Sequence, residues 1–148
     1  METGVAYGRS SAYILQALHE NQKGKLYSID YVFRPWQSKQ AIGSAIPHRL
    51  RYRWELVFGT TSEKLPSLLD SLGMIDIFFH DSLHTYKTMS FEFHQSWPHI
   101  KQGGFLISDD AKGNNAFHNF CVIKNLKSLY LLQESGIDAA MGILQKQS

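Results

Sequence analysis

The first thirty residues constrain the fold of this 148-residue chain more than any other stretch. A glycine-rich turn spans Glu2 to Ser11, an apolar segment with helical spacing follows it, and a short apolar run then ends at Asp30. Glycines let a backbone approach a ligand closely, and a carboxylate at a strand end can accept hydrogen bonds from both hydroxyls of a ribose. The order of turn, helix, strand and acidic residue therefore predicts an α/β fold that binds a nucleotide-like ligand.

The rest of the chain continues the alternation of strands and helices. Strands are predicted over residues 25–29, 54–58, 75–79 and 105–108, and helices over residues 11–23, 65–72, 85–97 and 115–126. Ser10 or Ser11 is expected to cap the first helix. Two apolar runs, 128–133 and 139–144, are separated by Gly136 and predict a hairpin. We therefore expect one domain over residues 1–148, with a Rossmann-like, mostly parallel sheet, helices on both faces and a C-terminal antiparallel hairpin.

Met1 stands where the first strand of such a sheet should precede the glycine turn. Losing a central strand would leave the backbone groups of its neighbours without partners. The sequence therefore predicts that the N-terminal strand and the helices before it are missing, as in an N-terminally truncated gene product.

The segment from Tyr31 to Arg53 is long, irregular and basic. Loops of this length inside compact domains are often lids or binding loops. Two interpretations stay open. The segment is either a solvated connector, or a lid whose arginines hold an anionic group of a substrate.

Polar residues follow four of the predicted strands. They are Asp30, Gly59 to Ser62, His80 to Ser82, and Ser108 to Asp110. Ligands of open parallel sheets lie beyond the carboxyl ends of the strands. Neighbouring strands are about 4.8 Å apart, so Asp81, Asp109 and Asp110 can converge on one ion. Such an oxygen-rich site favours Mg²⁺ over Mn²⁺ or Ca²⁺. The alternative is that these aspartates cap the helices that follow them.

His84 lies three residues beyond Asp81 and is a candidate general base. A neutral imidazole can take a proton from a substrate hydroxyl near neutral pH. His80 and His84 also have the spacing of a zinc pair, but that spacing needs a helix and His80 ends a predicted strand. Zinc is therefore the less favoured interpretation.

Three runs of residues carry a family resemblance. The acidic-x-Gly-x-x-x-Gly pattern from Glu2 to Gly8 resembles the first motif of class I S-adenosylmethionine (SAM)-dependent methyltransferases. Residues 80–86, followed by Met89 and Glu92, and residues 103–110 resemble the macrocin- and mycinamicin-type O-methyltransferases. The resemblance extends to the terminal hairpin. It implies an enzyme that transfers a methyl group from SAM to a hydroxyl of a sugar or another natural-product-like acceptor.

The resemblance also implies roles for individual residues. Glu2, Gly4 and Gly8 would surround the amino-acid part of SAM, and Asp30 would bind its ribose. Gly59, Thr60 and Ser62, at the next strand end, are also expected to contact the cofactor. Magnesium would be held by Asp81, Asp109 and Asp110, with His84 as the general base.

Composition excludes several other classes of protein. A net charge of +2 without a clustered basic face argues against nucleic acid as a partner. The single Cys121 excludes an internal disulfide and a cysteine-based zinc site. No apolar run approaches the ~18 residues of a membrane span, and no signal peptide is recognisable, so we expect a cytoplasmic protein without a membrane partner. Homo-oligomerisation is left open.

Two alternative functions remain. One is a non-catalytic or degenerate SAM-binding domain, which the missing strand makes plausible. The other is an NAD-dependent oxidoreductase, against which the absence of a GxGxxG pattern argues.

Overall fold

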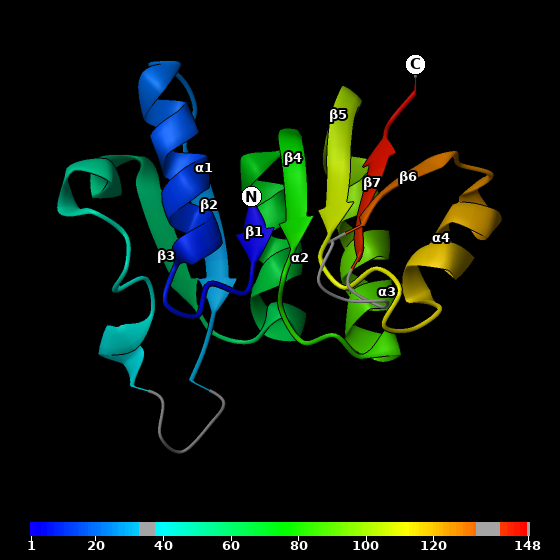
Figure 1. Cartoon of the computed structure of the whole chain (residues 1–148), viewed down its shortest axis with the longest axis horizontal. Coiled ribbons are helices and arrows are strands. Elements are labelled where there is room, and N and C mark those ends of the chain that lie inside the picture. The colour runs from blue at the N-terminus through cyan, green and yellow to red at the C-terminus, as the bar shows by residue number, and fades with distance from the viewer. Residues whose placement is uncertain (33–37, 133–139, 148) are drawn as a thin grey trace. The chain divides into compact units, whose positions relative to one another are not determined.

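The computed structural model describes residues 1–32, 38–132 and 140–147 (Figure 1). The chain divides into two compact units, Met1–Lys64 and Leu65–Ser148. Strands and helices alternate in both units, as the sequence predicts for an α/β fold.

The first unit contains a parallel sheet with the strand order β3-β2-β1. Its elements are β1 (Glu2–Thr3), α1 (Arg9–Glu20), β2 (Leu26–Asp30) and β3 (Trp54–Phe58). The strand before the glycine turn consists of only the two residues of β1, which pair with Ser28 and Ile29 of β2. Leu15 of α1 packs with Leu26 of β2 in a buried core, so α1 covers one face of this sheet (Figure 1).

The start of α1 differs from the expected serine cap. The N-cap is Gly8, whose φ of 83° lies in the left-handed region, and no side chain caps the helix. Ser11 is buried inside the helix, and its hydroxyl donates to the Glu2 carboxyl. The serine is therefore used to join α1 to β1 rather than to cap the helix.

The segment after β2 contains two 3₁₀ turns, Lys39–Ala41 and His48–Arg53. Arg51 donates to the carbonyl oxygens of Gly43 at 3.0 Å and Ile46 at 3.2 Å, and Arg53 donates to that of Gly24 at 2.9 Å. These guanidinium groups hold the backbone of the segment in place. The lid interpretation needs arginines available to a ligand, and these three hydrogen bonds do not support it. Arg34 lies outside the described residues.

The second unit contains a mixed sheet with the strand order β4-β5-β7-β6. The strands are β4 (Ile75–His80), β5 (Ile100–Ser108), β6 (Ser128–Leu132) and β7 (Ala140–Gln145). β4 and β5 are parallel, whereas β7 is antiparallel to both β5 and β6. The predicted C-terminal hairpin is confirmed, although its predicted turn at Gly136 lies outside the described residues.

Three α-helices accompany these strands. They are α2 (Thr61–Leu72), which begins in the first unit, α3 (Tyr86–Ser96) and α4 (Ala116–Lys124); the 3₁₀ turn Trp97–His99 follows α3. Phe93 of α3 packs edge-on against Phe117 of α4, with 5.9 Å between ring centroids. This aromatic contact lies in the core between α3 and α4.

β5 begins earlier than expected. The strand predicted over residues 105–108 is part of a longer strand, and Gly103 and Gly104 both lie inside β5. A Cβ on Gly104 would lie 2.5 Å from the carbonyl oxygen of Asp76, so only glycine allows this close approach. The pairing of β4 with β5 also shifts register between Ile75 and Ile77. The glycines therefore mark an irregularity within the strand.

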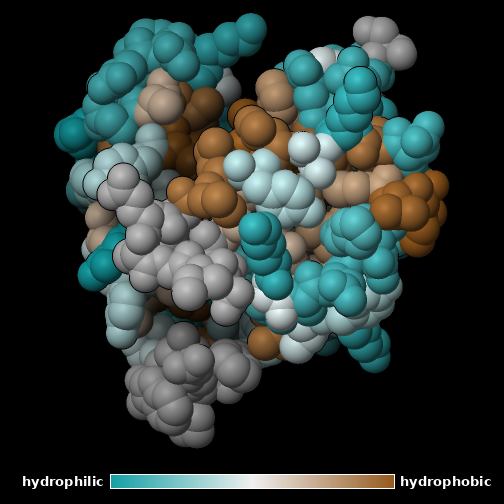
Figure 2. All heavy atoms as spheres, turned by 45° about the vertical axis from the view of Figure 1, so that its right-hand side comes forward, coloured by the Kyte–Doolittle hydropathy of each residue, from teal (hydrophilic) through white to brown (hydrophobic). Residues whose placement is uncertain are grey.

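The surface mixes polar and apolar side chains (Figure 2). In the second unit Val122 and Ile123 of α4 and Leu132 of β6 are exposed. Among the described residues, no helix has the length and apolar character needed to cross a membrane.

Glu2 of β1 has a fully buried carboxyl. Its Oε1 accepts hydrogen bonds from the hydroxyls of Ser11 at 2.5 Å and Ser28 at 2.7 Å. Its Oε2 is buried and has no hydrogen-bond partner. Burial raises the pKa of Glu2 above the ordinary 4.5, and the two hydroxyl bonds oppose this only in part.

We expect Glu2→Gln to remove part of the pH dependence of stability. Because the pKa of Glu2 is raised in the folded protein, the free energy of unfolding falls as pH rises from about 4.5 through the folded-state pKa, and is level above it. Glutamine keeps an acceptor for both serines and does not titrate, so this fall should disappear and the variant should be the more stable at neutral pH. Urea unfolding at a series of pH values measures the free energy of unfolding of both proteins.

Glu20→Gln is the matched control, because Glu20 is an exposed residue of α1. It should retain the wild-type pH dependence. An identical pH dependence in Glu2→Gln and wild type would show that Glu2 does not hold its proton more tightly in the folded state.

Candidate active site

The carboxylate of Asp30, at the end of β2, organises the glycine turn. Oδ2 accepts hydrogen bonds from the backbone N–H groups of Val5 at 2.9 Å and Ala6 at 2.7 Å. Oδ1 accepts one from the N–H of Tyr31 at 2.6 Å. The acidic residue that the sequence assigns to a ribose thus also fixes the backbone of the turn.

The turn itself depends on residues in the left-handed region. Gly4 and Gly8 have φ values of 82° and 83°, and Ala6 has 47°. A Cβ on Gly8 would lie 2.8 Å from the side chain of Ile46 and 2.9 Å from the Cα of Gly43. Gly8 therefore has no room for a side chain.

The end of β3 lies beside Asp30. The N–H of Gly59 donates to the carbonyl oxygen of Asp30 at 3.0 Å. Thr60 precedes α2, and its N–H donates to the carboxylate of Glu63 at 3.3 Å, while its hydroxyl lies 3.2 Å from that of Ser62. Hydrogen bonds from Thr60 lower the pKa of Glu63. The predicted cofactor residues of the two strand ends are therefore adjacent.

Glu2 differs from the other predicted cofactor residues. Its side chain is fully buried and directed to Ser11 and Ser28. These hydrogen bonds join β1 to α1 and to β2 next to the glycine turn.

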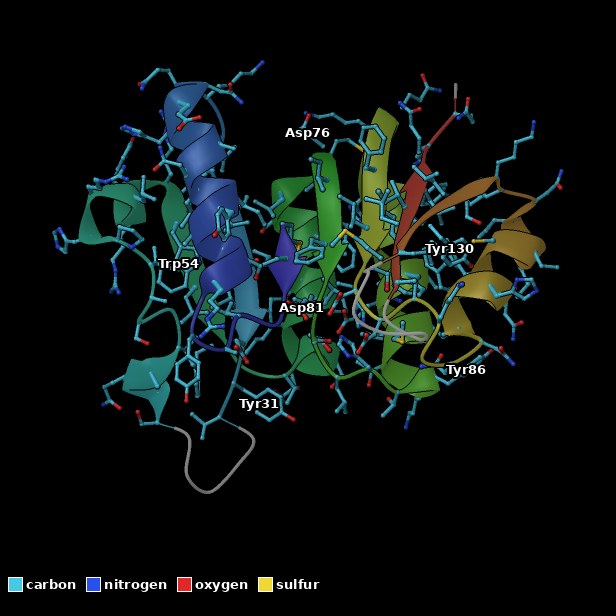
Figure 3. All side chains as sticks on the ribbon, in the orientation of Figure 1. Tyr31, Trp54, Asp76, Asp81, Tyr86 and Tyr130 are labelled. Atoms are coloured by element: carbon cyan, nitrogen blue, oxygen red, sulfur yellow. The ribbon has the colours of Figure 1, made fainter. Side chains whose placement is uncertain are left out.

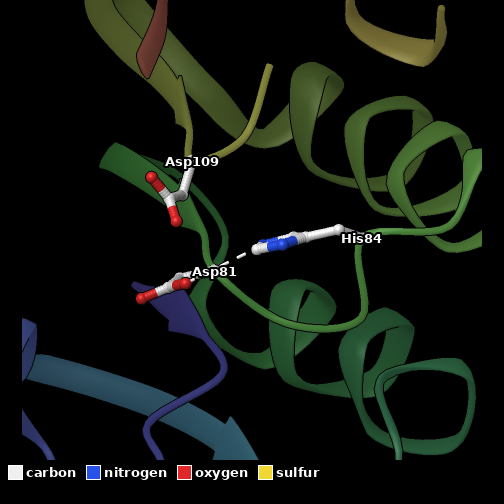
Figure 4. A group of neighbouring side chains, drawn as sticks. All are labelled: Asp81, His84 and Asp109. Carbon is white, nitrogen blue, oxygen red and sulfur yellow. Dashed lines mark ion pairs between the residues drawn. The ribbon is translucent and has the colours of Figure 1, made fainter. Parts of the chain in front are cut away.

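The second unit brings other predicted site residues together. Asp81 follows β4 in the loop that leads to α3, which begins at Tyr86 (both residues are labelled in Figure 3), and Asp109 follows β5. These strands are parallel neighbours, and the N–H of Asp109 donates to the carbonyl oxygen of His80 at 2.9 Å. One side-chain donor atom from each of Asp81, His84 and Asp109 lies within 4.8 Å of the others (Figure 4).

Asp110 is outside this group of donor atoms and contacts His84 instead. Its φ of 46° is left-handed, and its Oδ2 lies 3.0 Å from Nδ1 of His84. A carboxylate at this distance accepts a hydrogen from Nδ1. Nε2 is buried without a hydrogen bond and lies 3.8 Å from Oδ1 of Asp81. The two ring nitrogens of His84 therefore have different surroundings.

His80 has a different environment from His84. It is fully buried, and its Nδ1 lies 2.7 Å from Oε2 of the equally buried Glu92. This contact does not support the zinc-pair interpretation. The prediction of site residues omitted Glu92, although a glutamate on the buried face formed by Met89, Phe93 and Ser96 is a signal that the sequence offers.

Comparison with known families identifies the chain. Residues 1–111 match the family described as "Methyltransferase domain". The chain belongs to this family. A search of curated proteins found no significant match.

Solved structures share the fold of this methyltransferase domain at low sequence identity. The O-methyltransferase NovP is 14% identical with a TM-score of 0.71, and the match covers 99% of this chain and 71% of NovP. The O-methyltransferase TomG from Streptomyces achromogenes, solved with SAM, is 18% identical with a TM-score of 0.71, covering 98% of this chain and 71% of TomG. The fibrillarin pre-rRNA processing protein of Methanococcus jannaschii is 14% identical with a TM-score of 0.71, covering 99% of this chain and 65% of fibrillarin. The Rossmann-like methyltransferase fold predicted from the sequence is confirmed.

Proposed function

We propose that the protein transfers the methyl group of SAM to a hydroxyl of a small molecule, such as a sugar or another natural-product-like alcohol. The observation that carries the proposal is the group formed by Asp81, His84 and Asp109 at two parallel strand ends, in a chain of the methyltransferase domain family. The structural likeness to NovP and TomG supports oxygen as the acceptor atom.

In this proposal the first unit binds SAM. The turn carrying Gly4 and Gly8 approaches the amino-acid part of SAM, because its glycines leave the backbone open. Asp30 accepts a hydrogen bond from the ribose with the Oδ1 lone pair that Tyr31 does not use. Gly59, Thr60 and Ser62 contact the cofactor beside it. Glu2 supports this turn from below.

The second unit binds the acceptor and a divalent cation. Carboxylate oxygens of Asp81 and Asp109 are suitable ligands for Mg²⁺, and two carboxylates this close repel each other without a cation. When bound, the ion would stabilise negative charge on the acceptor oxygen. Asp110, the third ligand predicted from the sequence, has Oδ2 on His84, so in this proposal it would reach the ion only with its other oxygen.

His84 removes the proton. Its Nε2 accepts the hydrogen of the acceptor hydroxyl as the oxygen attacks the sulfonium methyl group, and the carbon–sulfur bond breaks to leave S-adenosylhomocysteine. Asp110 holds the ring through Nδ1 and stabilises the imidazolium that forms. Alignment and charge placement then supply much of the rate acceleration.

The direct test uses SAM with a labelled methyl group and a panel of sugars, polyketides and simple alcohols. Transfer of the labelled methyl group to a hydroxyl of one of these acceptors supports the proposal. SAM binding without transfer to any acceptor favours a non-catalytic SAM-binding domain, and binding of NAD in preference to SAM favours an oxidoreductase.

Asp30→Ala should weaken SAM binding about tenfold or more, because it removes a charge-assisted acceptor. It should also lower the free energy of unfolding by about 1–3 kcal/mol, because the N–H groups of Val5 and Ala6 lose their partner. Calorimetric titration and urea unfolding measure the two effects. Asp70→Ala, at an exposed aspartate of α2, is the control and should leave both unchanged. Wild-type SAM affinity in folded Asp30→Ala would refute the ribose assignment.

His84→Ala should slow methyl transfer by roughly 10²- to 10⁴-fold with little change in SAM affinity, because the lost interaction belongs to proton transfer. Single-turnover kinetics with saturating SAM measures the chemical rate. His118→Ala removes an exposed histidine of α4 and should behave as wild type. A near wild-type rate in His84→Ala would mean that another group removes the proton.

EDTA should abolish transfer, and added Mg²⁺ should restore it. Asp81→Asn and Asp109→Asn should weaken the binding of Mn²⁺, used as a paramagnetic probe, whereas the exposed control Asp76→Asn should not. Asp110→Asn separates two roles. Loss of Mn²⁺ affinity identifies a ligand, whereas a lower rate at unchanged affinity identifies a residue that orients His84. Full activity in EDTA would exclude the metal.

A further inference from the structure

Glu92 has a buried carboxyl that contacts the residues on both sides of Asp81. The side chains of His80 and Glu92 are both fully buried, and Nδ1 of His80 lies 2.7 Å from Oε2 of Glu92. The hydroxyl of Ser82 donates to the other oxygen, Oε1, also at 2.7 Å. Glu92 therefore binds the residue before Asp81 and the residue after it.

The His80 ring is held on several sides. Its Nδ1 shares a hydrogen bond with Oε2 of the Glu92 carboxyl. The ring packs edge-on against Phe93 at 5.5 Å and lies 5.3 Å from the ring of His84. His80 thus fills the space between the core of α3 and the candidate base.

The loop that carries Asp81 and His84 is short and is held along its length. Glu92 holds its start, and the side-chain amide of Asn114 donates to the carbonyl oxygen of His84 at 3.3 Å. At its end the hydroxyl of Thr85 accepts from the N–H of Thr88 and caps α3. Of these contacts, the Glu92 contacts are the ones that flank Asp81.

We propose that Glu92 is a positioning residue for methyl transfer, which sets the orientation of Asp81 and His84 by holding Ser82 and His80. The proposal rests on the proposed function. Buried ionic groups often contribute less stability than apolar residues of similar size, so a glutamate on the buried face of α3 with Met89 and Phe93 points to a role other than packing. Groups that orient ligands and bases from the next layer of contacts affect both metal affinity and rate.

The test compares Glu92→Gln, Glu92→Asp and Ser82→Ala with wild type, and uses Glu20→Gln as a surface control. Glutamine has the shape of glutamate but only one acceptor oxygen, so Ser82 or His80 must either accept from the glutamine amide or lose its hydrogen bond. We expect kcat to fall about 10- to 100-fold in Glu92→Gln, with KM for SAM within about twofold of wild type, and Mn²⁺ to bind about 10- to 100-fold more weakly. Glu92→Asp keeps both acceptors and should recover part of each loss, while Ser82→Ala should show a smaller loss.

A merely structural role predicts another result. Glu92→Gln would then have a lower melting temperature, but its folded fraction would keep the wild-type kcat and Mn²⁺ affinity. That result would overturn the proposal. Amide NMR signals of residues 81–85 provide a readout independent of activity. If wild type transfers no methyl group, the proposed function fails, yet shifted and broadened 81–85 signals in Glu92→Gln still support the positioning role. Unchanged signals overturn it.

Discussion

The hydrogen bonds that Asp30 accepts from the glycine turn are the constraint on which the first unit depends. Backbone N–H groups in a left-handed turn have no partner in a helix or sheet, so another group must bind them. The Asp30 carboxylate binds those of Val5 and Ala6, and it can do so because β2 pairs with β1 in a single register. A slip by one residue would move Asp30 to the opposite face of the sheet. The shape of the turn therefore depends on the register in which β1 and β2 pair.

A buried carboxyl reinforces each of the two loops that carry candidate site residues. In the first unit Glu2 of β1 binds Ser11 of α1 across the glycine turn. In the second unit Glu92 of α3 binds Ser82 across the loop that follows β4. In both cases a carboxyl and a serine hydroxyl join a strand end to the next helix. These hydrogen bonds fix the loops, whose polar side chains lie at the strand ends.

Strand positions were predictable from sequence because they depend on short apolar runs. β3 has the predicted bounds, and the ends of β4 and β5 place Asp81 and Asp109 together as parallel strands require. The expected serine cap of α1 and the expected start of β5 were wrong for a common reason. Ser11 is recruited by Glu2, and Gly104 is required by the backbone of Asp76, so both depend on contacts between distant parts of the sequence. The contact of Asp110 with His84 depends on a left-handed φ at a non-glycine residue, which no spacing reveals.

The proposed roles in the second unit use different kinds of atom. Nδ1 of His84 lies 3.0 Å from Asp110, so the proposal assigns the proton transfer to Nε2. An Nε2 that binds a cation has no lone pair left for a proton, hence the same ring cannot act as ligand and base in one turnover. The carboxylates of Asp81 and Asp109 have no such conflict, because each has two oxygens and neither must accept the proton of the hydroxyl. Assigning the cation to the carboxylates and the proton to His84 lets all these groups act at once.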